Sequence, residues 1–252
     1  MNMGAWNLMK YLNDIKTKIK WEQFYSPDFD WRNFYDYEIL MNNEFTKLFK
    51  KHLRKLNWYY ISKSYDLSCE FLVKFGNHIN WYTLIYQNAL SEEVLRNETV
   101  QQYIDKNNWL WTGVFSEQNV SEQFMREFAP KKLGEDIPWS VIWRHKKVSE
   151  KFISDFHKHI VNFIPHENHT YNCWNDIFTH QNLSEKFIRK YTDEFDDYAW
   201  KQLARYQTLS KAFIKQFKHK LDIRLLEKNT KIPLQIRKAL KSEIFNKPLF
   251  TF

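Results

Sequence analysis

Apolar and polar positions recur in a fixed order along most of this chain, and a tryptophan opens each copy of the pattern. Nine residues after the tryptophan stands an aliphatic residue, and a serine follows it directly. The six copies are Trp58, Leu67 and Ser68; Trp81, Leu90 and Ser91; Trp111, Val120 and Ser121; Trp139, Val148 and Ser149; Trp174, Leu183 and Ser184; and Trp200, Leu209 and Ser210. Because the copies agree at several positions at once, the pattern indicates tandem repeats of one structural unit.

Each copy predicts a pair of short helices. Apolar residues at the tryptophan position and three residues later mark one face of a first helix of about two turns. The serine predicts the N-cap of a second helix, since its side-chain oxygen can accept from a free amide of the first turn. In four copies a glutamate follows the serine and complements the positive end of the helix dipole. These are Glu92, Glu122, Glu150 and Glu185.

The second helix has an apolar face of its own. The aliphatic residues one position before the serine and four positions after it have the spacing of a hydrophobic staple. An aromatic residue continues this face at Phe75, Phe128, Phe156, Tyr191 and Phe217, whereas Glu98 breaks the pattern in the second copy. The tryptophans stand 23 to 35 residues apart, so the variable length falls in the links between helix pairs.

Degenerate copies flank the six clear ones. Upstream, Tyr35 fits a first helix, and a second helix fits Met41, Asn42 as its cap, Phe45 and Phe49. Downstream, Pro233 replaces the cap serine among Ile223, Leu226, Ile232, Ile236 and Leu240. An amphipathic face at the N-terminus comprises Leu8, Tyr11, Leu12, Ile15 and Ile19. We therefore predict an N-terminal amphipathic helix or cap in residues 1–30, helical hairpins in 31–222 and a degenerate capping hairpin in 223–252.

The composition agrees with a helical fold. Only 4 Gly and 6 Pro are present, fewer than the turns of strand-rich folds need, and the 43% of hydrophobic residues excludes a disordered tail. One hairpin is too small to bury its own apolar face, so neighbouring hairpins have to stack. The prediction is an all-α chain, specifically an α-solenoid of seven or eight short hairpins joined by variable linkers.

The pattern of Trp, two further residues and Ile or Leu, followed by Leu-Ser-Glu-x-Phe-Ile, resembles tandem helical repeats in proteins of giant DNA viruses and bacteriophages. Its clearest copies are Leu183 to Ile188 and Val148 to Ile153, and the resemblance covers about residues 58 to 220. Such a resemblance implies an architecture and an interaction role, with no catalytic residues to transfer. It also implies a host cytoplasmic location if the source is viral.

Charge and cysteine content narrow the functional classes. The formal net charge of +8 favours acidic partners, although the excess is mostly Lys spread along the chain, as a lysine-rich surface or the codon bias of an AT-rich genome would also give. Cys69 and Cys173 cannot form a disulfide framework. With no secretory signal and no apolar run of eighteen residues, we expect a cytoplasmic protein without membrane contact.

One cluster lies outside the repeat pattern, in the longest link. It comprises His157, His159, His166, His169 and Cys173. Imidazole and thiolate are the usual zinc ligands, so His166, His169 and Cys173 are weak metal candidates. Their spacing matches no familiar zinc motif, and histidines near a helix end or in a loop have a structural explanation. We therefore expect no metal and no cofactor.

The sequence offers no catalytic constellation, since the recurrent serines are explained as caps and no phosphate loop or nucleophile elbow is found. The leading hypothesis is a non-enzymatic scaffold whose first helices present Lys63, Tyr86, Arg144 and Arg205 to an acidic protein partner. The alternative is binding of RNA or single-stranded DNA along a basic face. A contiguous basic surface would favour nucleic acid, and mixed charge with exposed aromatic residues would favour protein.

Overall fold

The computed structural model describes residues 21–64, 66–87, 90–133, 139–164 and 169–245. The predicted N-terminal amphipathic helix lies, up to residue 20, outside the described residues. The chain divides into two compact units. Unit 1 comprises Met1–Ala89 and Glu93–Tyr103, and unit 2 comprises Leu90–Glu92 and Ile104–Phe252.

The fold is all-α, as predicted, apart from one short β-hairpin. In and next to unit 1 the elements are α2 (Trp21–Phe24), α3 (Tyr37–Met41), α4 (Asn43–Leu48), η1 (Leu53–Lys55), α5 (Trp58–Ser64), α6 (Cys69–Phe75), α7 (Trp81–Gln87), α8 (Glu92–Arg96) and α9 (Glu98–Ile104). Those of unit 2 are η2 (Asp105–Asn107), α10 (Leu110–Glu117), α11 (Glu122–Lys132), α12 (Ser140–His145), α13 (Glu150–Asp155), η3 (His157–His159), β1 (Val161–Ile164), β2 (His169–Asn172), α14 (Trp174–His180), α15 (Glu185–Ile188), η4 (Thr192–Glu194), α16 (Asp197–Tyr206), α17 (Lys211–Gln216), α18 (Ile223–Lys228) and α19 (Leu234–Phe245). No helix in the described part of the chain is long and apolar enough to cross a membrane.

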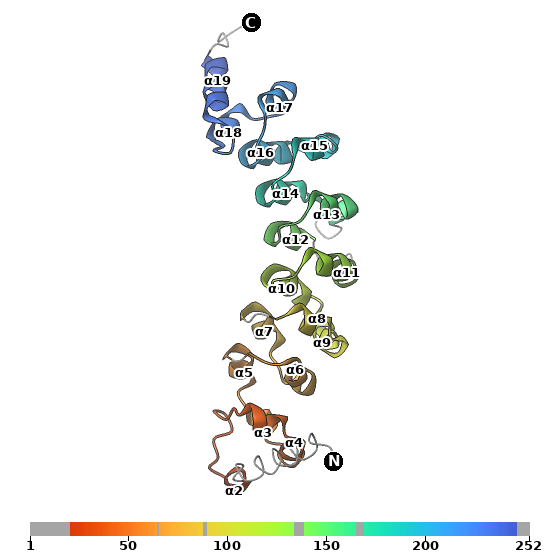
Figure 1. Ribbon diagram of the computed structural model, residues 1–252, viewed down its shortest axis with the longest axis vertical. Helices are drawn as coiled ribbons and strands as arrows, with labels where there is room; N and C mark the ends of the chain where they lie inside the picture. The colour runs from red at the N-terminus through yellow and green to blue at the C-terminus, as the bar shows by residue number, and fades with distance from the viewer. Residues whose placement is uncertain (1–20, 65, 88–89, 134–138, 165–168, 246–252) are drawn as a thin grey trace, which may run out of the picture. The chain divides into compact units, whose positions relative to one another are not determined.

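The hairpins of unit 2 are arranged in two rows. Each first helix packs against the next, in the order α10, α12, α14, α16 and α18 (Figure 1). The second helices α11, α13, α15 and α17 form the other row. In unit 1, α5 packs against α7 in the same way.

The predicted caps explain where the second helices begin. Ser68, Ser121, Ser149, Ser184 and Ser210 each accept a hydrogen bond from the amide three residues later, at Oγ–N distances of 3.1 to 3.2 Å. In the degenerate first copy, Asn42 accepts in the same way from Phe45 N at 3.0 Å. The cap assignments at these six positions are confirmed.

The tryptophans form the core with an aromatic ring of their own hairpin. Trp111, Trp139 and Trp174 are fully buried. Trp139 lies 5.1 Å from the Phe156 ring, and Trp174 lies 5.1 Å from the Tyr191 ring. The two helices of each pair are thus held together by rings that the sequence pattern places opposite each other.

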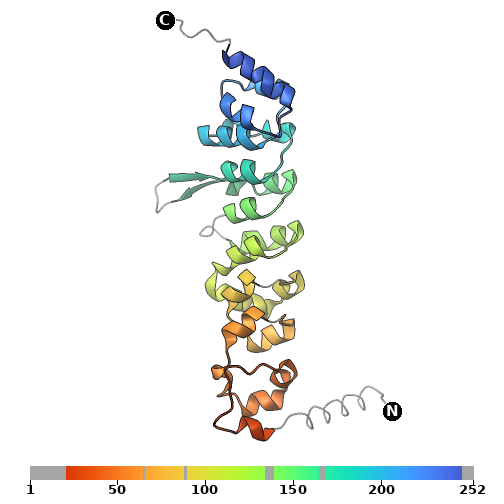
Figure 2. The same ribbon diagram turned by 90° about the vertical axis from the view of Figure 1, so that its left-hand side faces the viewer.

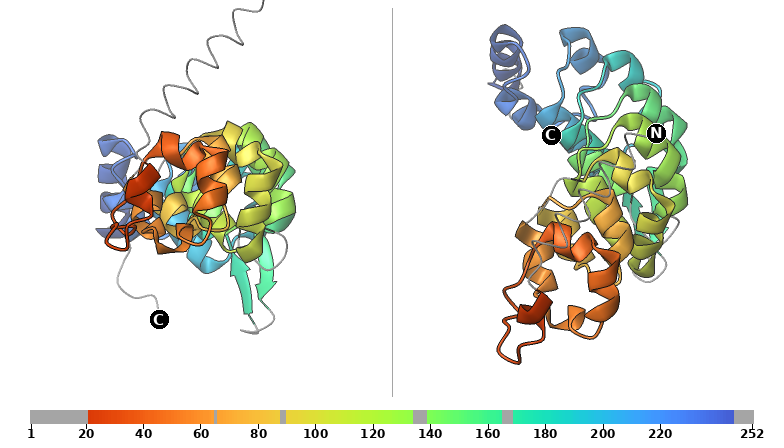
Figure 3. Two further views of the ribbon diagram at one scale, coloured as in Figure 1. Left: turned by 90° about the horizontal axis from the view of Figure 1, so that it is seen from below. Right: turned by 60° about the horizontal axis from the view of Figure 1, so that its bottom comes forward.

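Two links differ from the expected form. The link after η3 was expected to be a loop but forms an antiparallel hairpin in which Val161 pairs with Asn172 and Ile164 with His169. It extends away from the helices (Figures 2 and 3). In the second copy, Asn97 Oδ1 accepts from Val100 N at 3.2 Å and starts α9 as a new helix. This restart is why Glu98 does not fit the repeat.

Candidate interaction surface

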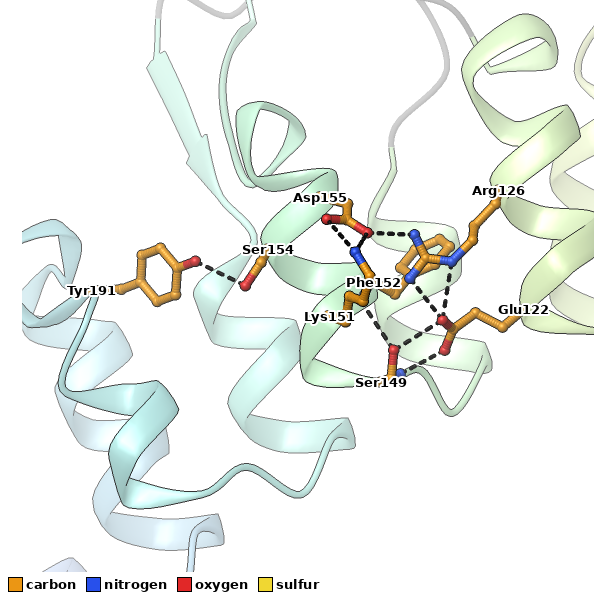
Figure 4. A network of polar contacts seen from close by, with 8 residues as sticks. All are labelled: Glu122, Arg126, Ser149, Lys151, Phe152, Ser154, Asp155 and Tyr191. Atoms are coloured by element: carbon orange, nitrogen blue, oxygen red, sulfur yellow. Dashed lines mark hydrogen bonds and ion pairs between the residues drawn. The ribbon is translucent and has the colours of Figure 1, made fainter.

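The recurrent glutamates join neighbouring hairpins. Glu122 in α11 accepts from Ser149 N at 2.8 Å and from Ser149 Oγ at 2.9 Å, so the cap serine of one hairpin is bound by the previous hairpin (Figure 4). Glu150 binds Ser184 N and Oγ at 2.5 and 3.1 Å. The same contact joins Glu92 to Ser121 and Glu185 to Ser210. We call these four contacts the Ser–Glu ladder.

The Ser–Glu ladder ends with the contact between Glu185 and Ser210. After the last cap serine stands Lys211 in place of glutamate, and the next cap position is Pro233. Proline has no amide hydrogen, so no acceptor is required from the preceding hairpin. The glutamates were predicted only to complement the helix dipole, and the contact to the next hairpin is an additional role.

Two arginines, each five residues after a cap serine, make further contacts at the same junctions between hairpins. Arg126 pairs with Glu122 at 2.8 Å and with Asp155 of the next hairpin at 2.6 Å (Figure 4). Its guanidinium also lies 5.0 Å from the centre of the Phe152 ring. Arg189 lies in the same way over Phe213, at 4.7 Å. These cations are used between hairpins and are not free for a partner.

The surroundings of Glu122 set its charge state. Burial by itself would raise the pKa of this carboxyl, but hydrogen bonds from Ser149 and Arg126, together with the positive charge of Arg126, lower the pKa below 4.5. The ladder glutamate is therefore held in the ionised form that accepts hydrogen bonds.

A second column of polar groups is buried between the first helices, seven residues after the tryptophan. Gln181 donates to Trp143 O and Lys146 O, both at 2.7 Å, and accepts from Val148 N at 3.2 Å. Gln207 repeats the arrangement one hairpin later, with 2.7 and 2.8 Å to Phe178 O and Gln181 O. Sequence reasoning missed this column because glutamine is usually exposed. Its signal was present as Gln118, Gln181 and Gln207 at equivalent positions.

Lys146 occupies the glutamine position in one hairpin. Its Nζ donates to Ser116 O at 3.1 Å and to Gln118 O at 2.5 Å. Burial lowers the pKa of this ammonium group, and the charge of Glu117 acts in the opposite direction. The position therefore requires a donor to the preceding helix, whatever side chain supplies it.

The four predicted partner-binding residues lie on first helices, two in each unit. Lys63 in α5 is exposed, and Tyr86 in α7 stacks on Tyr82 with ring centres 4.5 Å apart. Arg144 in α12 pairs with Asp176 of α14 at 2.8 Å and keeps 46% of its side chain exposed. Arg205 in α16 is exposed and lies 5.9 Å from the Tyr206 ring centre. Arg144 therefore also has a structural contact, which the sequence did not predict.

The described members of the histidine cluster make structural contacts. His157 Nε2 lies 2.8 Å from Glu194 Oε2, and the His159 ring stacks on Trp139 at 4.0 Å. Burial, with the nearby charge of Lys158, lowers the pKa of His159. Cys173 is buried, and desolvation raises the pKa of its thiol to about 12.

The other metal candidates are not described: His166 lies outside the described residues, as does the side chain of His169. Among the residues that the structure describes, no three His, Cys, Asp or Glu side chains come together as a metal site would require.

Comparison of the chain with protein families, with curated proteins and with solved structures gave no match.

Proposed function

We propose that this chain is an α-solenoid that acts as a non-enzymatic scaffold for a partner protein of acidic character. The proposal is based on one observation: the recurrent polar groups make their hydrogen bonds inside the array of hairpins. The cap serines, the ladder glutamates and the buried glutamines are bonded within or between hairpins. A repeat whose polar groups all serve packing builds a framework, and its exposed and variable positions are left to make external contacts.

Two positions of each first helix fit a partner of opposite charge, and their side chains are exposed or half-buried except for the buried Ser140. One and five residues after each tryptophan, the side chains are Tyr59 and Lys63, Tyr82 and Tyr86, Thr112 and Ser116, Ser140 and Arg144, Asn175 and Thr179, and Lys201 and Arg205. These positions include several cations and no acid. Tyrosine and arginine are among the residues enriched at protein interfaces. We propose Lys63, Tyr86, Arg144 and Arg205 as contacts.

We also propose where the scaffold acts and what kind of protein it binds. If the source is a virus, as the resemblance of the repeats suggests, the partner is a host or defence protein that the scaffold sequesters in the host cytoplasm. This step rests on analogy between repeats, because an architecture alone does not specify a function.

The test is affinity capture from a lysate of the source or host cell, with and without nuclease, followed by mass spectrometry. We expect a discrete protein that is retained after nuclease treatment. Charge reversal on the first-helix face, Lys201→Glu with Arg205→Glu, should release it. The control Lys186→Glu with Lys190→Glu changes the charge equally on exposed residues in and beside α15, in the second row, and should retain it. Proteins bound only through nuclease-sensitive material would reject the scaffold.

A further inference from the structure

Charge in unit 1 is segregated along the chain. Between Glu44 and Asp66 there is no acidic residue, and six cations fall in this interval: Lys47, Lys50, Lys51, Arg54, Lys55 and Lys63. All six are exposed, and none has an ion pair with another described residue. A general lysine bias would add cations, but it would not remove every acid from positions 45–65.

Four of these cations lie in the segment between α4 and α5, just before an exposed tyrosine in the first turn of α5. The chain runs from the end of α4 through η1 into the first turn of α5, so Lys50, Lys51, Arg54 and Lys55 precede Tyr59 closely. Tyr82 has the same place in the first turn of α7, which packs against α5. Tyr59 is 52% exposed and Tyr82 is 63% exposed. We call these six residues the Lys/Tyr patch.

Two acidic residues, Asp28 and Asp30, lie on a loop next to the Lys/Tyr patch. The loop that carries Asp28 and Asp30 packs against the turn after α4 through Trp31, whose ring lies 4.7 Å from that of His52. Asp30 is engaged locally, with Oδ2 accepting from Asn33 Nδ2 at 2.8 Å. Among the described residues, neither Asp28 nor Asp30 forms an ion pair with a cation of the patch, so these cations remain available to an external anion.

We infer that the Lys/Tyr patch binds single-stranded nucleic acid, a function separate from the scaffold proposed above. Its cations would contact phosphates, and Tyr59 and Tyr82 would stack on unpaired bases, the combination that sequence-tolerant single-strand binders use. Lysine supplies three of the four cations of the patch, whereas Tyr and Arg supply three of the four contacts proposed for a protein partner. Because lysine is depleted at protein interfaces and Tyr and Arg are enriched there, the composition of the patch favours nucleic acid over protein. A duplex is disfavoured because its base faces are already stacked on one another.

The number of cations in the Lys/Tyr patch sets an upper limit on how steeply the affinity for nucleic acid falls with salt concentration. Four phosphate contacts on a single strand give a slope of log affinity against log salt of about −3 at most. The affinity should therefore fall by up to about 50-fold between ~50 and ~200 mM KCl.

The experiment measures fluorescence anisotropy of labelled oligouridine and oligothymidine of about 20 nucleotides with the full chain, a length that exceeds one binding site. Lys50→Glu with Lys51→Glu and Lys55→Glu should weaken binding by about 10-fold or more. The matched control reverses three exposed lysines in and beside α17, Lys211, Lys215 and Lys218, with the same change in net charge. Equal weakening by both triple variants would show that only net charge matters and would overturn the inference.

The tyrosines give an independent readout. Tyr59→Ser with Tyr82→Ser should weaken binding by about 25-fold or more, because each of the two lost stacking contacts accounts for at least about 5-fold. The corresponding Phe variants keep the ring and should bind like the natural chain. Far-UV circular dichroism confirms that each variant is folded.

Two further outcomes would reject the patch as a nucleic-acid site: no binding at ~50 mM KCl, or competition by polyglutamate as effective as that by unlabelled oligonucleotide. Binding of either oligonucleotide that the patch variants weaken and the control variant leaves unchanged supports it, and the tighter one distinguishes RNA from DNA.

Discussion

Replacing Glu150 with alanine tests whether the Ser–Glu ladder couples hairpins. Glu150 belongs to α13 and accepts from both the amide and the hydroxyl of Ser184, which caps α15. The substitution removes both bonds and leaves the α13 backbone unchanged. It also removes an acid from the first turn of a helix, so the effect of the helix dipole has to be separated from that of the contact between hairpins.

The magnitude follows from the two hydrogen bonds. A bond to a charged group contributes about 1.5 to 3 kcal/mol when it is shielded from water. Ser184 is exposed, so water replaces part of what is lost, and we expect about 1 to 2 kcal/mol from the contact. Loss of the acid at the helix start adds about 0.3 to 1 kcal/mol. The free energy of unfolding should therefore fall by about 2 kcal/mol, a decrease in Tm of about 4 to 8 °C for a unit of this size.

The measurement is urea unfolding followed by far-UV circular dichroism, with amide hydrogen exchange at Ser184. The control is Asp197→Ala, because Asp197 is an exposed acid in the first turn of α16 and makes no hydrogen bond to another hairpin among the described residues. We expect the control to show the dipole effect alone. If the two variants lose the same stability, and Ser184 keeps its exchange protection in Glu150→Ala, the ladder does not couple hairpins and the reasoning is refuted.

Three further substitutions and a pH titration test other contacts. Gln181→Leu leaves buried backbone groups without partners and should lower the free energy of unfolding by about 3 kcal/mol or more in urea titrations. Lys146→Gln removes a partly buried charge and restores the amide of neighbouring hairpins, so it should raise stability by up to about 1 kcal/mol, and a loss would contradict that account. Gly76→Ala places a Cβ in steric conflict with the edge of the Tyr103 ring and should lower the thermal midpoint of unit 1 through about 1 to 3 kcal/mol of overpacking, with Tyr103→Ala as the variant that relieves it. Because the folded pKa of Glu122 lies below 4.5, its stabilisation is present above pH 4.5 and is lost as the pH falls below it. The natural chain should accordingly lose stability in acid more steeply than Glu122→Gln, and parallel acid titrations would argue against it.

Features that a single copy of the repeat encodes were predictable. The hydrogen bond that Phe152 N donates to Ser149 Oγ joins residues three apart, and the pairing of Trp139 with Phe156 follows from the helical periods within one hairpin. The same local logic placed Asn42 as a cap in a degenerate copy. Hydrogen-bonding capacity and apolar spacing at short range therefore determine the hairpin.

Contacts between copies were missed because they depend on how hairpins pack. Glu122 and Ser149 are 27 positions apart, and nothing within one copy indicates that they meet. The link around Cys173 was missed for a different reason, because its two short strands pair only with each other and lie outside the repeat. The exposed residues Lys63 and Tyr86 could be named from their positions, but their surroundings depend on tertiary structure.

The Ser–Glu ladder stops at Ser210, before the cap position held by Pro233, and this has a consequence for how such a chain can change in length. Every junction from Glu92 to Ser210 presents the same acceptor on one side and the same donors on the other. A whole hairpin could therefore be duplicated or deleted inside this interval without leaving an amide unpaired. A copy inserted between Lys211 and Pro233 would bring a serine amide that faces lysine. Growth and shortening in evolution are thus expected within the array, while the last hairpin stays fixed as its terminus.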